Sequence, residues 1–319
     1  MKSLLLLLSG FLLSLCAGAQ NYPARPIKMV VAYQAGGATD AFARMVVQKF
    51  SANIGQTVII DNRAGGNSII GSDYVSKAQP DGYTILLNPA SHVLIPFYTK
   101  KMPYDALKDF TPIIAAAYNN RCLVVNLDLP VKTLTDFIAY AKSNPGKLSY
   151  GVAAAGSAQE LAGDLLKFSA GIDMLPVPYK GGGPALQDLL GGQIQAGIFV
   201  LADTLQYIKS GRLKALGIIE GKRSKAASSI PTFAEAGVTG FVIPDQWIGV
   251  FGPPGLSPDI ANKLNLAMNK TLLNPEVRTA LESIGYESTG GSMQEFEVLL
   301  GDDQLKYRKI AETIALKPS

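Results

Sequence analysis

Short runs of β-branched residues alternate along this chain with longer segments of helical periodicity, and this alternation constrains the fold most. The run Ile27–Ala32 predicts a strand, and the segment 38–53 that follows has Phe42, Met45 and Val46 at the spacing of one helix face. Strands that alternate with helices are typical of α/β folds with mostly parallel sheets. We therefore predict an α/β protein with mostly parallel sheets flanked by helices.

The alternation continues to the end of the chain. The further predicted strands lie at residues 57–61, 83–87, 123–125, 148–152, 174–178, 194–200, 213–218 and 247–251. The further predicted helices lie at residues 69–77, 134–143, 158–170, 184–190, 258–272, 275–284 and 293–314. Of the 319 residues 48% are hydrophobic, and this length and composition predict two domains rather than one.

The first 19 residues have the composition of a removable export signal. Lys2 precedes a mostly apolar core at residues 4–15, and 17–19 supply the small residues that a signal peptidase requires. The core is shorter than the ~20 apolar residues of a membrane-spanning helix. We predict a signal peptide over residues 1–19, cleaved after Ala19, and a periplasmic protein. Cys16 leaves lipidation open, although the residue before it is large.

Charge and cysteine content exclude several classes of protein. The exported chain would have 28 basic and 25 acidic residues, because the signal removes only Lys2, and this balance is too mild for a nucleic-acid binder. Cys122 would be the one cysteine left, and its apolar surroundings in the sequence indicate a buried thiol. We expect no nucleic-acid partner and no internal disulfide.

Residues suited to catalysis or metal binding are sparse. His92 is the single histidine, so any Ser-His-Asp or Cys-His centre would need it. One histidine and one remaining cysteine cannot form a zinc site, and Asp302-Asp303 lacks the spacing of a calcium loop. We expect Asp302-Asp303 to lie on a solvated helix surface. We expect no metal, no cofactor and no enzyme. His92 can be a structural residue, a ligand-lining residue or a catalytic base.

Four glycine-containing loops each lie between a predicted strand and a predicted helix, at residues 33–40, 64–68, 154–157 and 180–183. In open α/β sheets ligands bind outside the carboxyl ends of the strands, where such loops lie. Glycine lets a ligand approach the backbone amides, and a helix start favours an anion. A tight turn explains each loop alone, but four together favour a binding protein for small acids.

The first of these loops offers two modes of binding. A side-chain oxygen of Asp40 can cap the helix start, and a direct contact between Asp40 and a ligand stays open. A carboxylate could also dock on the amides of Gly36 and Gly37, where each charge-assisted hydrogen bond contributes ~1.5–3 kcal/mol. Arg63 and Arg121 are candidate carboxylate clamps, with structural roles open for both.

Ordered sequence blocks carry a resemblance to one receptor family through the whole exported chain. The blocks are Pro26-Ile27, Ala35–Asp40, Asn62–Asn67, Pro80–Thr84, Met102–Asp105, Val177–Gly192, Pro231–Gly237, Trp247 and Gly252–Gly255. In them the chain resembles the solute-binding receptors of the tripartite tricarboxylate transporter system, also called the Bug family. The resemblance implies a two-domain periplasmic binding protein (type II) that closes on its ligand like a Venus flytrap.

The resemblance also implies a domain division and a function. Domain I would comprise residues 20–122 and 246–319, and domain II residues 123–245. The protein would be a monomeric periplasmic receptor that captures a small carboxylate, such as a dicarboxylate, an acidic amino acid or an aromatic acid. It would deliver that solute to the membrane permease subunits of a tripartite transporter. A sensor receptor for a signalling system, or an enzyme that uses His92, are the alternatives.

Two facing loops, 33–40 and 156–159, would hold one carboxylate through backbone groups and waters, as the resemblance implies. The predicted ligand-binding residues are Tyr33, Gly36, Gly37, Ala38, Thr39, Asp40, Ser91, His92, Gly156, Ser157, Ala158, Tyr179, Gly181 and Asp203. Tyr33 and His92 would shape specificity. Packing of Tyr179 and a helix cap by Asp203 are the structural alternatives. Glu160 near a helix start favours an amine-bearing ligand or complements the helix dipole.

Overall fold

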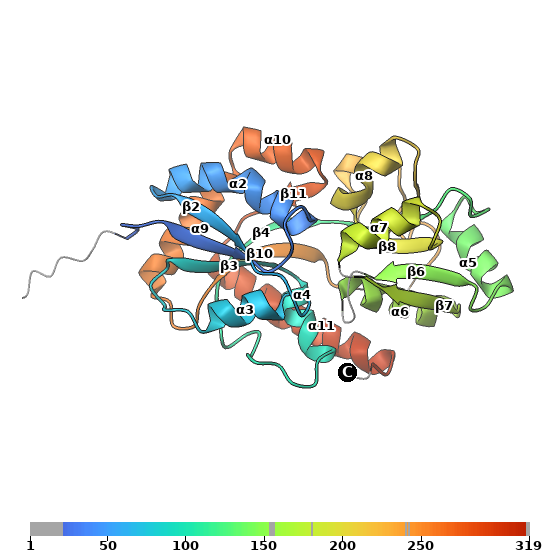
Figure 1. Ribbon diagram of the computed structural model, residues 1–319, viewed down its shortest axis with the longest axis horizontal. Coiled ribbons are helices and arrows are strands. Elements are labelled where there is room, and N and C mark those ends of the chain that lie inside the picture. Colours follow the sequence, from blue (N-terminus) through green and yellow to red (C-terminus); the bar gives the residue numbers. More distant parts are fainter. Residues whose placement is uncertain (1–21, 153–156, 180, 240, 242, 317–319) are drawn as a thin grey trace, which may run out of the picture.

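The computed structural model describes residues 22–152, 157–179, 181–239, 241 and 243–316, so the predicted signal peptide at 1–19 lies outside the described residues. Two lobes lie side by side along the long axis of the molecule (Figure 1). The first lobe is built on a six-stranded sheet and the second lobe on a five-stranded sheet. Within the described ranges, the helices are too short or too polar to cross a membrane.

The sheet of the first lobe has the strand order β11-β4-β10-β3-β1-β2. Its strands are β1 (Ile27–Val31), β2 (Val58–Asn62), β3 (Thr84–Pro89), β4 (Thr111–Asn119), β10 (Gln246–Gly252) and β11 (Tyr286–Ser288). β1 pairs in parallel with β2 and β3, whereas β10 is antiparallel to β3 and β4, and β11 is antiparallel to β4.

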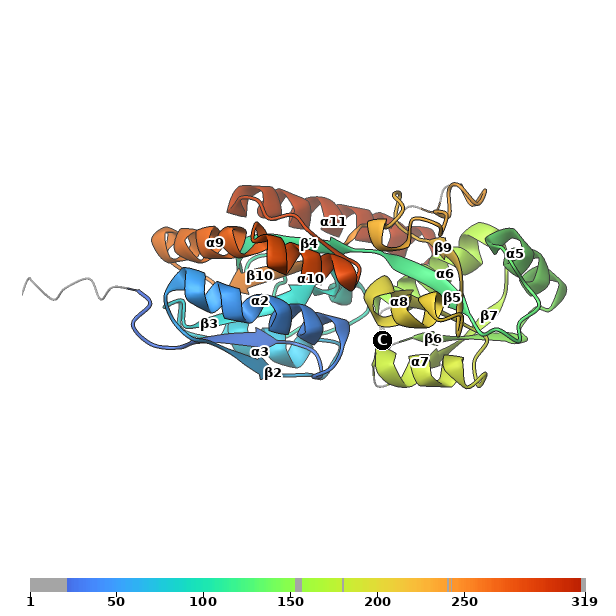
Figure 2. The ribbon, with the colours of Figure 1, turned by 90° about the horizontal axis from the view of Figure 1, so that it is seen from above.

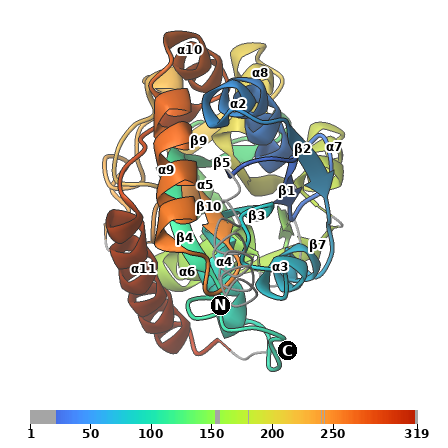
Figure 3. The same cartoon turned by 90° about the vertical axis from the view of Figure 1, so that its left-hand side faces the viewer.

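Helices cover both faces of this sheet. They are α2 (Ala38–Ile54), α3 (Ile69–Ser76), α4 (Ser91–Leu94), the 3-10 helix η1 (Ile95–Phe97), α9 (Pro258–Leu272), α10 (Pro275–Ser283) and α11 (Met293–Thr313). α2 and α9 lie on one face, and α3 and α11 lie on the other (Figure 3). Because side chains alternate along a strand, Met29 and Val31 of β1 join the core under α2 and α9, while Val30 joins the opposite core.

The sheet of the second lobe has the strand order β7-β6-β8-β5-β9. Its strands are β5 (Arg121–Val125), β6 (Leu148–Val152), β7 (Met174–Pro178), β8 (Ala196–Val200) and β9 (Lys214–Ile218). Its helices are α5 (Leu134–Ser143), α6 (Ala158–Ala170), α7 (Gly182–Leu190), α8 (Leu201–Lys209) and the 3-10 helix η2 (Lys225–Ala227). β6 pairs in parallel with β7 and β8, whereas β5 is antiparallel to β8 and β9.

The predicted α/β fold with two sheets flanked by helices is confirmed, and both sheets are mixed, since β10 and β11 run against the other strands of the first sheet and β5 against those of the second. The strands that run against their neighbours include β5 and β10, which bring the chain into a lobe from the other lobe. β5 follows β4 directly across the lobe boundary (Figure 2). A parallel pair of strands needs a crossover connection, usually a helix, so a strand that enters a sheet without one can run antiparallel to its neighbours.

The chain passes between the lobes at Asn120 and again within residues 219–245. The predicted boundary between residues 122 and 123 therefore falls inside β5, whereas the predicted boundary between 245 and 246 falls at the start of β10. The sequence pattern placed Cys122 in a strand but could not reveal that the strand starts at Arg121. The division into domains stays a prediction.

A buried ion pair joins the two crossings. Arg121 Nε lies 2.7 Å from Glu220 Oε1, and the backbone N–H of Arg121 donates to Glu220 Oε2 at 2.7 Å. Arg121 Nη2 also donates to Pro244 O at 2.6 Å. Burial opposes the charge of Arg121, but the Glu220 carboxylate outweighs it and raises the pKa of Arg121 above its ordinary value. Arg121 is therefore a structural residue and has no exposed surface for a ligand.

Two further predictions concern buried side chains. Cys122 is buried in β5 as a free thiol, as predicted. Asp303 was expected on a solvated helix surface, but it is 1% exposed. It accepts a hydrogen bond from Trp247 Nε1 at 2.8 Å, and Lys306 Nζ lies 3.1 Å away. These two donors explain how a carboxylate is accommodated in that core.

Candidate ligand-binding site

The loop after β1 forms an exposed glycine turn that leads into α2. Gly36 has φ of +87°, in the left-handed region that favours glycine, and its N–H donates to Asp40 Oδ2 at 2.9 Å. Gly37 is the N-cap residue of α2 and adopts an extended backbone conformation. The Gly36 amide is therefore not free to bind a carboxylate, contrary to the prediction, because it already donates to Asp40.

Asp40 holds this turn in place from within the protein. It is 1% exposed, and Arg44 Nε and Asn62 Nδ2 also donate to its carboxylate at 2.7 and 3.0 Å. Burial would raise the pKa of Asp40, but the hydrogen bonds from Arg44, Gly36 and Asn62 outweigh it and hold that pKa below its ordinary value. Asp40 therefore positions the turn, and a solute would find its oxygens already bonded.

The start of α2 is left open by this arrangement. In the described part of the chain, no side chain caps the helix, so the first-turn amides of Ala38 and Thr39 have no side-chain acceptor. A helix of 17 residues also presents the positive end of its dipole here. Unbonded amides and a helix dipole together can hold an anionic group.

Tyr33 and Ser91 lie behind the turn and bond each other. Tyr33 Oη and Ser91 Oγ are 2.7 Å apart, and Tyr33 Oη lies 3.5 Å from Asn67 Oδ1. Burial raises the pKa of Tyr33 above its ordinary value. Ser91 is 4% exposed, so its hydroxyl is occupied by Tyr33 and is not presented at the surface.

His92 lies in the core of the first lobe and not at a surface. Its side chain has no exposure, and its Nδ1 and Nε2 lie 3.1 Å from Asn88 Nδ2 and 2.9 Å from Ala106 O. The rings of Phe251 and Phe110 lie 4.4 and 4.6 Å away, centroid to centroid. Burial lowers the pKa of His92 to about 4. The structure thus favours the structural alternative over a ligand-lining residue or a catalytic base.

The second lobe contributes the start of α6. Ser157 is its N-cap residue, and the Ser157 hydroxyl accepts a hydrogen bond from the Glu160 N–H at 3.3 Å. Ser157 is 2% exposed and Ala158 is 6% exposed. The predicted residue Gly156 lies outside the described residues. The hydroxyl of Ser157 caps its own helix, which leaves its backbone as the part that a ligand could use.

The starts of α7 and α8 lie together. Gly181, the N-cap residue of α7, has φ of +123°, and a Cβ on Gly182 would lie 3.9 Å from Asp203 Oδ2 in the first turn of α8. Burial raises the pKa of Asp203 to about 6. Tyr179 Oη donates to Asp188 Oδ2 at 2.7 Å, so its hydroxyl has a structural partner.

The starts of α2 and α7, which carry several of the predicted residues, are turned toward the lobe boundary (Figure 1). His92 instead lies in the core of the first lobe. A Cβ on Gly285 of the first lobe would lie 3.6 Å from the Ala202 N of α8. The prediction missed Asn62 and Arg44, which hold Asp40. Asn62 belongs to a block of the family resemblance, but nothing local indicates its contact with Asp40.

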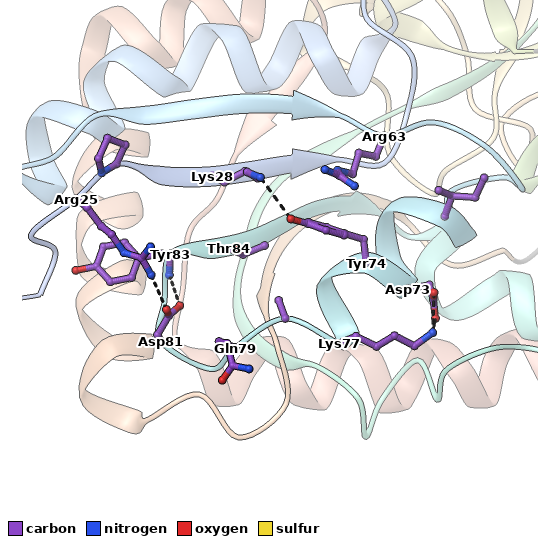
Figure 4. A pocket seen from close by; sticks show the side chains of 13 residues that line it. Arg25, Lys28, Arg63, Asp73, Tyr74, Lys77, Gln79, Asp81, Tyr83 and Thr84 are labelled. Atoms are coloured by element: carbon purple, nitrogen blue, oxygen red, sulfur yellow. Dashed lines mark hydrogen bonds and ion pairs between the residues drawn. The ribbon is translucent and has the colours of Figure 1, made fainter.

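A recess of about 780 Å³ lies on the first lobe, beside α3 (Figure 4). It has four basic residues in its lining, and each of them is paired. Arg25 lies 2.8 Å from Asp81, Lys77 lies 2.6 Å from Asp73, and Lys28 and Arg63 lie 3.8 and 2.9 Å from Asp61. The Arg63 guanidinium also lies 3.6 Å from the Tyr74 ring centroid. Arg63 is thus not a free carboxylate clamp, and none of the described predicted site residues lines this recess.

Two α/β lobes joined by two crossings, with helix starts turned toward their boundary, define the class of periplasmic binding proteins. Residues 42–316 match the model of the family described as "Tripartite tricarboxylate transporter family receptor". The chain belongs to this family of solute receptors, which confirms the resemblance to the Bug family.

Relatives and solved structures agree with this assignment. Protein BugT of Bordetella pertussis is 35% identical over 301 residues, which cover 94% of this chain and 92% of BugT. A Rhodopseudomonas palustris protein solved with adipate is 34% identical with a TM-score of 0.89, covering 94% of this chain and all of that one. MatC from the same organism, with bound malate, is 29% identical with a TM-score of 0.82, covering 91% of this chain and 99% of MatC.

Proposed function

We propose that this protein is a monomeric periplasmic receptor that captures a small carboxylate and delivers it to a membrane permease. The observation that carries the proposal is the open start of α2 after the Gly36–Gly37 turn, which faces the second lobe. The similar proteins solved with adipate and with malate support a carboxylate as the solute, because both molecules carry carboxylates.

The carboxylate would lie on the backbone amides of Gly37, Ala38 and Thr39 in the first lobe. The starts of α6 and α7, at Ser157 and Gly181, would close over it from the second lobe. Contacts that are shared between lobes exist only when the lobes are together, so the bound solute favours the closed form. The permease would then bind that closed form.

Calorimetric titration with adipate, malate and other small carboxylates tests the capture step. In a Gly37→Leu variant the new side chain would cover the amides at the start of α2, and Gly37 has φ of −84°, which leucine can adopt. Gly301→Leu on α11 is the control, because a Cβ there meets nothing within 4 Å. We expect Gly37→Leu to weaken binding at least tenfold, the loss of one charge-assisted hydrogen bond, and Gly301→Leu to leave it unchanged. Equal affinity in both variants would contradict the proposed site.

Delivery and export need separate measurements. Uptake of the solute by cells that lack the receptor gene should fall, and the wild-type gene should restore it. Amino-terminal sequencing of the periplasmic protein should begin at Gln20, and size-exclusion chromatography should give a monomer. Turnover of the bound acid by the purified protein would instead indicate an enzyme.

A further inference from the structure

Asp203 has a carboxylate that the described residues leave without a partner. It lies in the first turn of α8, a helix that no side chain caps. Within the described part of the chain, nothing gives Asp203 a hydrogen bond or an ion pair, and burial is the cause of its raised pKa. The side chain keeps some exposure, so solvent reaches it. Such a carboxylate has unused capacity to accept hydrogen bonds.

The position of Asp203 connects the two lobes. Its Oδ2 lies 3.9 Å from where a Cβ on Gly182, at the start of α7, would stand. The charge of Asp203 also acts on the first lobe, where it is the second cause, after burial, of the raised pKa of Tyr286 in β11. The Tyr286 ring lies 5.3 Å from that of Phe42 in α2. The helix that carries Asp203, α8, thus belongs to the second lobe but lies beside the end of the first lobe where α2 begins (Figures 1 and 2).

We propose that Asp203 binds the ammonium group of the solute, so that the preferred solute is a carboxylate that also carries an amine. This inference rests on the proposed function. The solute carboxylate would lie on the amides at the start of α2, and its ammonium would lie on Asp203. A zwitterion has the two opposite charges that these positions require, and it would bridge the two lobes.

The charges around Asp203 also disfavour a solute with a second carboxylate at that position. Arg121 and Arg63, the candidate clamps, are paired with Glu220 and Asp61. A second carboxylate placed beside Asp203 would meet a like charge, and like charges disfavour ionisation of both groups. An ammonium at the same position would complete the hydrogen bonding of Asp203.

Three matched pairs of solutes test this inference by calorimetry at pH 7.5. They are aspartate with succinate, glutamate with glutarate, and γ-aminobutyrate with butyrate, and the members of each pair differ by one amine. In the wild-type protein at least one amine-bearing member should bind at least tenfold more tightly than its partner. Asp203→Asn should reduce that preference at least tenfold, and should leave the affinity for the amine-free member unchanged or higher.

Asp188→Asn is the matched control, because Asp188 is a partly buried carboxylate of α7 whose partner is Tyr179. It should keep the wild-type preference. Asp203→Ser gives a second variant of smaller size, and both Asp203 variants should fold because no hydrogen bond within the described residues is lost. Tighter binding of the amine-free members, or a preference that survives in both Asp203 variants, would overturn the inference and leave the proposed function standing. No binding by any of the six solutes, adipate or malate would overturn both.

Discussion

Glu220 and Asp203 are two carboxylates near the lobe boundary, and they differ in the hydrogen bonds that they receive. Glu220 is 5% exposed and receives the backbone N–H and the side chain of Arg121, both at 2.7 Å. Asp203 receives nothing from the described residues. Since an isolated charge is costly to remove from water, the paired carboxylate belongs to the framework. The carboxylate without a partner among the described residues is the one that we propose for a ligand. Hydrogen-bond partners, more than burial, therefore separate the two roles.

The largest expected effect comes from breaking the Glu220 pair. Arg121→Met should lower the free energy of unfolding by about 3–5 kcal/mol, because Glu220 would stay buried without its partner. Urea denaturation at pH 7 measures it as a lower midpoint with an unchanged slope. The double variant Arg121→Met/Glu220→Leu should recover most of the loss. A single variant as stable as the wild type would show that the pair does not hold the crossings.

Asp40 extends the comparison to a carboxylate with three donors. Asp40→Asn should lower the free energy of unfolding by about 2 kcal/mol at pH 7, since charge-assisted hydrogen bonds are lost. Because the folded pKa of Asp40 is lowered, this stability is present above the unfolded pKa near 3.8 and is lost as the pH falls through the folded value. The difference between wild type and variant should therefore shrink in acid. A difference that grows below pH 4 would contradict this role.

Asp203 should show the opposite pH dependence. Its folded pKa of about 6 lies above the ordinary value of 3.8, so the folded state holds its proton more tightly between these values. Stability relative to Asp203→Asn should fall as the pH rises from about 4 to about 6, on the order of 1–2 kcal/mol for a side chain that keeps some exposure. Thermal denaturation across this range measures it. A rise over the same interval would mean that Asp203 has a favourable partner.

Tyr179 should give the smallest effect. Its hydroxyl donates to Asp188 at 2.7 Å, and Tyr179→Phe should lower the free energy of unfolding by about 0.5–1 kcal/mol, typical of one hydrogen bond. Solute affinity should change less than twofold, because the hydroxyl faces Asp188. A tenfold loss of affinity in a normally folded variant would return Tyr179 to the ligand-binding residues.

Much of the secondary structure could be predicted from local sequence. β6, α6 and α9 have the predicted bounds. For the two helices, strong periodicity coincides with the N-cap residues Ser157 and Ser257. β4, α8 and β11 were missed. β4 combines Pro112 with three successive alanines, and β11 has only three residues, so neither has the composition of a strand. Both strands form because they pair with neighbours that are distant in the sequence.

The α/β class, the glycine loops at strand-to-helix junctions and the family resemblance follow from the sequence alone, because they depend on spacing along the chain. Which polar groups are already paired becomes visible only in the folded protein. Asp40 accepts the hydrogen bond of the Gly36 amide, and both ring nitrogens of His92 are within hydrogen-bond distance of groups in the core. Asp203 is left without a partner among the described residues. The physical reason is that hydrogen bonds and burial depend on distances between residues far apart in the chain, such as His92 and Ala106, which periodicity does not encode.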